Sequence, residues 1–294
     1  MNEGEATVTM AQMPLVLLIG AQKAGTSAIA DWLFDHGGFS RPNVFDGEPS
    51  FYSKEVHFFD IDHRYCKGPM FYGERFDGCD GVDATPDTLQ FAERVHNCYK
   101  AAGGNQMRLV KIMVILREPI LRELSLYNHL AHDCRFLPLS ERTSWQEQVL
   151  DDDGDIMSFD DFVAQVSLPG LATKSDSGRS SRHGLYAAHL NQWFELFDRS
   201  QILVLSYQEL QENPRSLQQR IQKFLGREIP GELKRANSND HDHKVRLPSK
   251  KALALLVDIF ESENEKLYGL LEANPGPSME QRPFLRFSKP IAGE

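Results

Sequence analysis

The residues of this chain best suited to chemistry lie in a glycine-containing loop with the sequence G-A-Q-K-A-G-T-S at residues 20–27. An apolar run at residues 15–19 comes before the loop and predicts a buried strand. Apolar residues at helical spacing come after it and predict a helix over residues 26–36. A helix start offers free backbone N–H groups and the positive end of the helix dipole, and Lys23 adds a charge. The loop therefore predicts a phosphate-type anion site.

The order of residues in the loop separates it from the loop of nucleotide triphosphatases. That loop reads G-x-x-x-x-G-K-[ST], with its lysine after the second glycine, whereas here Lys23 precedes Gly25. The order G-x-x-K-x-G-T-S resembles the 5′-phosphosulfate loop of sulfotransferases, which use 3′-phosphoadenosine-5′-phosphosulfate (PAPS). The structural alternative is an ordinary strand-to-helix turn with a solvated lysine. The resemblance implies that the donor is bound by Lys23, Ala24, Gly25, Thr26 and Ser27.

A second candidate segment, R-E-P-I-L-R-E-L-S-L-Y at residues 117–127, follows the strongest predicted strand, residues 109–116. Arg117 at the carboxyl end of this strand would lie where open α/β sheets bind ligands, and Ser125 can point back from the next helix. A guanidinium and a hydroxyl suit a terminal phosphate. The segment resembles the 3′-phosphate motif of the sulfotransferase superfamily, which implies that role for both residues. The alternative is that Arg117 only pairs with Glu118 or a neighbouring acid.

The third candidate is the segment K-E-V-H-F-F-D at residues 54–60. It resembles the K-E-x-H-F-F-D segment of the heparan sulfate 3-O-sulfotransferase branch, in which the glutamate is the catalytic base. An acceptor hydroxyl or amine must lose a proton as it attacks sulfur, and a carboxylate such as that of Glu55 can take it. His57 is the competing base, because a short strand predicted over residues 56–59 would put both side chains on one face. We favour Glu55 and leave His57 open.

Weaker similarities extend the resemblance over residues 14–272. The segment V-D-A-T-P at residues 82–86 resembles the acceptor-side E-K-T-P segment of that branch, with Ala84 in place of its lysine. Lys244 and Arg246 stand where a K-G-R segment touches phosphate in the glycan enzymes, although a solvated basic turn explains them equally well. The amino-terminal membrane anchor and the late cysteine pair of the branch are not found.

Net charge and composition limit the classes of substrate and partner that this chain can bind. The formal net charge of −10 argues against nucleic acid and sulfated glycans, and favours a small neutral or cationic acceptor. An acidic run at residues 151–161 is the candidate wall of an acceptor pocket. The four cysteines are widely spaced without a C-x-x-C pair, so we expect reduced thiols and no metal site. No apolar run is long enough to span a membrane and residues 1–13 do not resemble a secretory signal, so we expect a cytoplasmic protein.

Alternating strand-like and helical patterns predict a single α/β domain around a parallel sheet. We place a flexible amino terminus at residues 1–13, the sulfotransferase domain at 14–272 and a tail at 273–294. The predicted strands are residues 15–19, 56–59, 80–83, 109–116 and 202–205. The predicted helices are residues 26–36, 88–98, 119–131, 185–197, 214–225 and 252–271, with short helical pieces near 145–150 and 158–166.

The three segments together predict sulfuryl transfer from PAPS, with 3′-phosphoadenosine 5′-phosphate as product and no metal required. Lys23 would stabilise the leaving phosphate and Glu55 would take the acceptor's proton. A P-loop-type small-molecule kinase is the rival enzyme, but it would need a lysine after Gly25. A non-catalytic nucleotide-binding protein is the third possibility. The sequence does not name the acceptor, distinguish O- from N-sulfation or give the oligomeric state.

Overall fold

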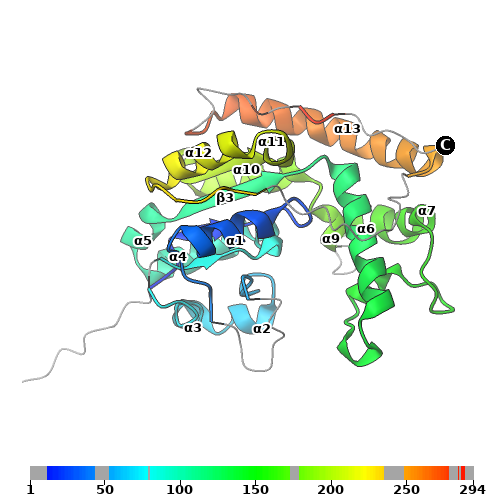
Figure 1. Ribbon diagram of the computed structural model, residues 1–294, viewed down its shortest axis with the longest axis horizontal. Coiled ribbons are helices and arrows are strands. Elements are labelled where there is room, and N and C mark those ends of the chain that lie inside the picture. Colours follow the sequence, from blue (N-terminus) through cyan, green and yellow to red (C-terminus); the bar gives the residue numbers. More distant parts are fainter. Residues whose placement is uncertain are drawn as a thin grey trace, which may run out of the picture.

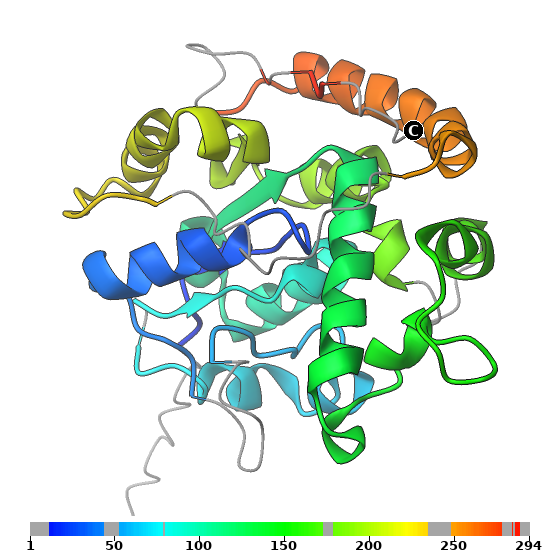
Figure 2. The same cartoon turned by 45° about the vertical axis from the view of Figure 1, so that its right-hand side comes forward.

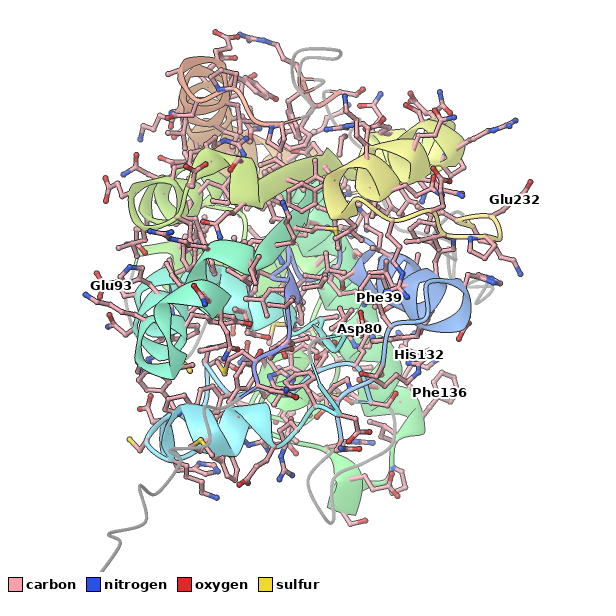
Figure 3. The ribbon with its side chains drawn as sticks, turned by 90° about the vertical axis from the view of Figure 1, so that its left-hand side faces the viewer. Phe39, Asp80, Glu93, His132, Phe136 and Glu232 are labelled. Carbon is pink, nitrogen blue, oxygen red and sulfur yellow. The ribbon has the colours of Figure 1, made fainter. Side chains whose placement is uncertain are left out.

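The computed structural model describes residues 12–43, 53–78, 80–172, 179–234, 248–277, 284 and 286–288. In this part of the chain four parallel strands form one sheet, surrounded by helices (Figure 1). Figure 3 shows α1 (Thr26–His36) and α12 (Pro214–Leu225) on one face of the sheet, and α4 (Ala92–Ala102) and α10 (Tyr186–Leu196) on the other. The predicted α/β fold with a parallel sheet is confirmed. The domain boundaries stay predictions.

The strands are β1 (Val16–Leu18), β2 (Val82–Asp83), β3 (Lys111–Leu116) and β4 (Ile202–Ser206). Their order in the sheet is β2-β1-β3-β4. Leu17 is in register with Ile112, which is in register with Ile202 on the other side. The apolar run predicted to be central is indeed flanked on both sides, which explains why polar residues are nearly absent from it.

The strand order determines where a ligand can bind. The chain passes from β1 outward to β2, and then back across β1 to β3 and β4. The switch in direction falls between β1 and β3, and open α/β sheets bind ligands beyond the carboxyl ends of the strands at such a point. The loops that follow β1 and β3 are the two that contain Lys23 and Arg117.

Helix α6 (Pro119–Phe136) begins directly after the β3 loop and runs along one side of the molecule (Figure 2). Its start is well defined, because Pro119 occupies the first turn and the Glu118 carboxylate caps the helix by accepting from the Leu121 N–H at 2.7 Å. The helix extends five residues beyond the predicted end at residue 131. This extra length carries residues to the candidate site that the sequence did not assign.

The remaining helices connect and cover the sheet. The α-helices are α2 (Asp62–Tyr65), α3 (Gly68–Gly73), α5 (Gly104–Leu109), α7 (Phe159–Phe162), α8 (Leu168–Ala172), α9 (Arg179–Arg182), α11 (Tyr207–Glu212) and α13 (Lys250–Ala273). Short 3₁₀ turns are η2 (Pro86–Gln90), η3 (Leu139–Glu141), η4 (Gln146–Val149) and η6 (Arg199–Gln201), and η5 (Val163–Ser167) is a π-turn. The predicted helices over 26–36 and 214–225 are confirmed to the residue, and the others are displaced by a few residues.

The strand predicted over residues 56–59 is wrong. Both the Val56 and His57 N–H groups donate to the Thr85 hydroxyl, at 2.8 and 3.1 Å, and not to a neighbouring strand. His57 has φ 49°, a left-handed conformation that a strand does not allow. Side-chain bonds therefore replace a sheet ladder here, and a strand face no longer explains how residues 55 and 57 meet.

Two apolar clusters hold the structure together. The larger one lies on both faces of the sheet and includes fully buried Leu190 and Trp193 of α10, the helix predicted to carry a core stripe. The smaller one packs α6 against α7 and α13 through Leu130, Phe162 and Phe260. Among the helices described here, none combines the length and apolar character needed to cross a bilayer.

Candidate active site

The loop after β1 is shaped by its glycines. Gly25 has φ 95°, and a Cβ there would lie 2.9 Å from a Leu210 methyl carbon. Gly20 has φ 141°, and a Cβ there would lie 2.9 Å from the Pro86 carbonyl oxygen. Both positions therefore need glycine for conformation and for space. The close packing holds the loop against its neighbours, so that its backbone keeps one conformation.

Helix α1 begins within this loop and leaves donors available for an anion. Gly25 is the N-cap residue and offers no side chain to cap the helix, so the first N–H groups of α1 have no helical or side-chain partner. The Ala24 N–H already donates to the Ala21 carbonyl at 3.1 Å. The free donors of the predicted cradle are thus those of Gly25, Thr26 and Ser27; the Thr26 side chain is buried and that of Ser27 is exposed.

Arg117 joins the loop after β3 to the loop after β1. Its Nη1 donates to the Lys23 carbonyl at 3.0 Å, and its guanidinium lies 4.6 Å from the centre of the Tyr207 ring. The Tyr186 hydroxyl donates to the Arg117 carbonyl at 2.7 Å, which connects the start of α10 to the same place. The alternative role for Arg117, pairing with Glu118 or a neighbouring acid, finds no ion pair or hydrogen bond among the described contacts; the Glu118 carboxylate caps α6 and interacts with Arg117 only through its charge.

Lys23 is electrostatically unusual. Burial, and after it the nearby positive charge of Arg117, lowers the pKa of Lys23 to about 8. Asp133, Lys54 and Glu55 also act on its charge. A bound anion would strongly stabilise the charged form of this lysine, because its ammonium group is desolvated and lies near a second cation.

Ser125 lies two turns into α6 and is half-buried. Its hydroxyl makes no hydrogen bond with another described residue, which leaves it able to donate to a ligand. Lys244 and Arg246, the other predicted phosphate contacts, lie outside the described residues.

Glu55, His57 and Asp60 form one chain of hydrogen bonds. The His57 ring contacts the Glu55 carboxylate through Nε2 at 3.0 Å and the Asp60 carboxylate through Nδ1 at 2.9 Å. Thr85 fixes the backbone of this segment by accepting both N–H groups, and its own hydroxyl donates to the buried Asp83 carboxylate. The sequence offered Glu55 and His57 as rivals; the structure links them.

The protonation states of this chain differ between its members. Burial alone would lower the pKa of His57, but its hydrogen bonds to Asp60 and Glu55 raise that pKa well above its usual range. Burial alone would raise the pKa of Glu55, but Lys54 and His57 outweigh it and lower the pKa. At neutral pH His57 is thus a cation between two carboxylates, and Glu55 is ionised, with one oxygen paired with Lys54 and the other with His57.

Lys54 was not assigned a role from the sequence. Its Nζ pairs with a Glu55 carboxylate oxygen and lies 3.4 Å from the Ala84 carbonyl oxygen. Ala84 itself is fully buried. Ala84, which replaces the lysine of the resembled glycan branch, therefore contributes only backbone groups here: its carbonyl oxygen near Lys54 Nζ, and its N–H, which donates to the Lys54 carbonyl at 2.9 Å.

Residues of α6 also reach this site. His129 interacts electrostatically with Lys23 and Glu55, and Asp133 with Lys23. Neither residue was found from the sequence. The available signal was their spacing, because Ser125, His129 and Asp133 follow one another at intervals of four and lie on one helix face.

Carboxylates in the acidic run at residues 151–161 accept hydrogen bonds that fix a loop and two helix starts. The Asp151 carboxylate closes its own loop by accepting the Asp155 N–H at 2.9 Å, and Asp161 accepts from the N-cap Ser158 hydroxyl at 2.6 Å. The Asp160 carboxylate accepts from Ser249, the N-cap of α13. Two of these contacts lie within the run and the third connects it to the start of α13. The acceptor wall expected from this run stays a prediction.

A group of potential metal ligands lies within the same site. One ligand atom from each of His57, Asp60 and Asp87 falls within 4.8 Å of the other two. Buried His183 contacts Asp87 at 3.3 Å. Because His57 is held protonated between carboxylates, a cation binding there would have to displace its proton. The sequence predicted no metal, and the residues neither require nor forbid one.

Comparison with known proteins identifies the family. The sulfotransferase domain model matches residues 14–257, so the chain belongs to the sulfotransferase domain family. The chain is 27% identical over 227 residues to the bifunctional heparan sulfate N-deacetylase/N-sulfotransferase 2 of Homo sapiens, which covers 74% of this chain and 22% of that protein. It is 28% identical over 234 residues to heparan sulfate glucosamine 3-O-sulfotransferase 3A1 of Mus musculus, with coverage of 78% and 48%. The family expected from the motifs is confirmed.

The curated relatives and the solved structure differ in how much of their own length this chain covers. The chain spans at most about half the length of these curated relatives. A solved sulfotransferase from Alicyclobacillus acidocaldarius shares the fold at a TM-score of 0.58 and 20% identity, over 88% of this chain and 96% of that one.

Proposed function

We propose that this protein transfers the sulfuryl group of PAPS to a hydroxyl or amine of a small neutral or cationic acceptor. Three observations support the donor half: the uncapped start of α1, desolvated Lys23, and Arg117 bonded to the same loop. The observation that carries the proposal is the convergence of Lys23 with Glu55, since an ionised base and a leaving-group cation must act on opposite sides of one sulfur atom.

In the proposed reaction, the acceptor oxygen or nitrogen forms a bond to sulfur while the bond from sulfur to the phosphate oxygen breaks. Glu55 takes the acceptor's proton, and His57 and Asp60 hold its carboxylate in place. Lys23 and the first N–H groups of α1 stabilise the charge that grows on the departing 5′-phosphate. Arg117 and Ser125 bind the 3′-phosphate and so position the donor. The products are the sulfated acceptor and 3′-phosphoadenosine 5′-phosphate, and no metal is assigned a role.

The acceptor class rests on separate support. The net charge of −10 opposes the approach of a polyanion, and Ala84 provides no charge for one. The curated relatives carry heparan sulfate in their names, so a glycan acceptor is the alternative to test. The cytoplasmic location stays a prediction.

Transfer of labelled sulfuryl from PAPS tests the proposal. The panel contains phenols, amino alcohols and heparan-type oligosaccharides, and the readout is labelled product together with released bisphosphate. We expect labelled small molecules and unlabelled oligosaccharides. Labelling of the oligosaccharides alone would contradict the acceptor class, and bisphosphate binding without labelling of any acceptor would favour a non-catalytic nucleotide-binding protein.

A further inference from the structure

The last turns of α6 present a large apolar side chain and a carboxylate to solvent. Phe136 is 63% exposed, although it is a large apolar side chain. Its ring centre lies 4.7 Å from that of His132, and Figure 3 shows both at the edge of the molecule. Exposed aromatic surface beside a catalytic centre is a common feature of ligand-binding sites.

Asp133 lies between this aromatic pair and the proposed transfer site. Its carboxylate is 3.8 Å from the His129 ring and 3.5 Å from the His132 ring, and one of its oxygens accepts from the Gln146 amide at 3.4 Å. The side chain is 16% exposed. It also interacts electrostatically with Lys23. The carboxylate is therefore both accessible and close to the reacting groups.

Five residues lie on one face of α6 in a fixed order. Ser125, His129, His132 or Asp133, and Phe136 are separated by three or four residues, which is the spacing of neighbours on a helix face. At 1.5 Å of rise per residue, Asp133 is about 6 Å beyond His129 along the helix, and Phe136 about 4.5 Å further. Donor phosphate, transfer site, carboxylate and aromatic ring thus follow one another along one helix.

We infer that this end of α6, defined by His129, His132, Asp133 and Phe136, is the acceptor subsite, and that it takes an amphipathic amine. The amine's ammonium group would pair with Asp133, its apolar part would lie on Phe136, and its nucleophile would reach Glu55. The inference rests on the proposed function and names the substrate class for that site.

The charges around the subsite favour a cation once the donor is bound. Burial, and after it the charge of Lys23, lowers the pKa of His129 to about 4, so this ring is neutral at neutral pH. The cations Lys23 and Arg117 are matched by the donor's phosphates, and Lys54 is paired with Glu55. Asp133 then has no strong cationic partner among these groups, and an ammonium would supply one. Binding of the amine and of the bisphosphate product should be mutually favourable.

The test is titration calorimetry on the full chain, first with the bisphosphate and then with amine probes on the bisphosphate complex. The probes are 4-phenylbutylamine, its neutral analogue 4-phenylbutan-1-ol, its anionic analogue 4-phenylbutanoate, and butylamine without the ring. We expect the phenyl amine to bind about tenfold more tightly than the alcohol. The carboxylate should bind most weakly, and butylamine more weakly than the phenyl amine.

Matched variants assign the two contacts. Asp133→Asn should weaken the phenyl amine about tenfold and leave the alcohol unchanged, whereas Asp152→Asn in an exposed loop should change neither. Phe136→Ala should weaken both probes about three- to fivefold, and Leu139→Ala, which removes an apolar side chain that is 75% exposed, should not. Retained binding of the bisphosphate verifies that each variant is folded.

The outcomes separate the two proposals. Equal binding of amine, alcohol and carboxylate, or an Asp133→Asn variant with unchanged amine affinity, would overturn the inference. So would a chain that binds bisphosphate but not the phenyl amine. A chain that does not bind the bisphosphate would instead overturn the proposed function.

Discussion

The donor half and the acceptor half of the candidate site are built in different ways. The donor half consists of two contiguous segments, each directly after a strand, and its main groups are backbone N–H groups with Lys23 and Arg117. The acceptor half is assembled from side chains of separate elements, among them Glu55, Asp87 and Asp133. A ligand shared by a whole family can be bound by a local motif, whereas a particular acceptor requires residues that only the tertiary fold brings together.

The largest expected effect on turnover comes from replacing Lys23, which lies near groups of both halves. Lys23→Ala should lower turnover by roughly two to four decades, because it removes the charge that stabilises the leaving phosphate. The assay is transfer from labelled PAPS, with exposed Lys100→Ala as the matched control. Turnover within a factor of a few of the unmodified protein would refute this assignment.

Glu55→Gln should affect the acceptor half of the site and leave the donor half intact. Turnover should fall by roughly two to three decades while bisphosphate affinity stays the same, because the base acts only on the acceptor. Activity and calorimetry on the same preparation give both values. If His57→Asn abolishes transfer and Glu55→Gln does not, the base is the imidazole.

Arg117→Ala, unlike Glu55→Gln, should weaken binding of the donor. Donor binding should weaken by about 1.5–3 kcal/mol, the usual contribution of a hydrogen bond to a charged group. Adenosine 5′-phosphosulfate, which lacks the 3′-phosphate, should be a far poorer donor than PAPS for the unmodified protein and only slightly poorer for the variant. Equal discrimination by both proteins would exclude a 3′-phosphate role for Arg117.

The smallest effect is a pH dependence in the donor half. Because the pKa of Lys23 is lowered to about 8, its charge is present below that pH and is lost above it. The bisphosphate affinity of the free protein should fall by up to about tenfold per pH unit above pH 8. Lys23→Arg should bind with little change over the same range, since arginine keeps its charge. A flat profile for the unmodified protein would show that Lys23 does not contact the phosphate.

The same comparison explains what could be predicted from the sequence. β1, α1 and β3 could be predicted because strong local patterns encode them: an apolar run that stops at Gly20, helical spacing after Thr26, and a strand before Arg117 that is apolar except for one lysine. The contact between Lys23 and Arg117 then follows from the order of parallel strands, since both residues lie beyond adjacent carboxyl ends.

The acceptor half could not be predicted in the same way. The backbone at Val56 and His57 is held by Thr85, 28 or more residues away, and alternation of apolar residues carries no information about such bonds. Asp133 was missed because α6 was expected to end at residue 131, although the helix continues to Phe136. Tertiary packing of α6 on η4, where the Cys134 thiol donates to the Gln146 carbonyl, rather than local propensity, keeps those last residues helical.

The central claim, that this loop binds the PAPS nucleotide, is tested most directly by calorimetric titration of the unmodified protein with 3′-phosphoadenosine 5′-phosphate and, separately, with ATP and Mg²⁺. The account predicts that the bisphosphate binds tightly without any divalent cation and that adenosine 5′-monophosphate, which lacks the 3′-phosphate, binds at least tenfold more weakly. Tight, Mg²⁺-dependent binding of ATP with no binding of the bisphosphate would contradict it and favour a kinase.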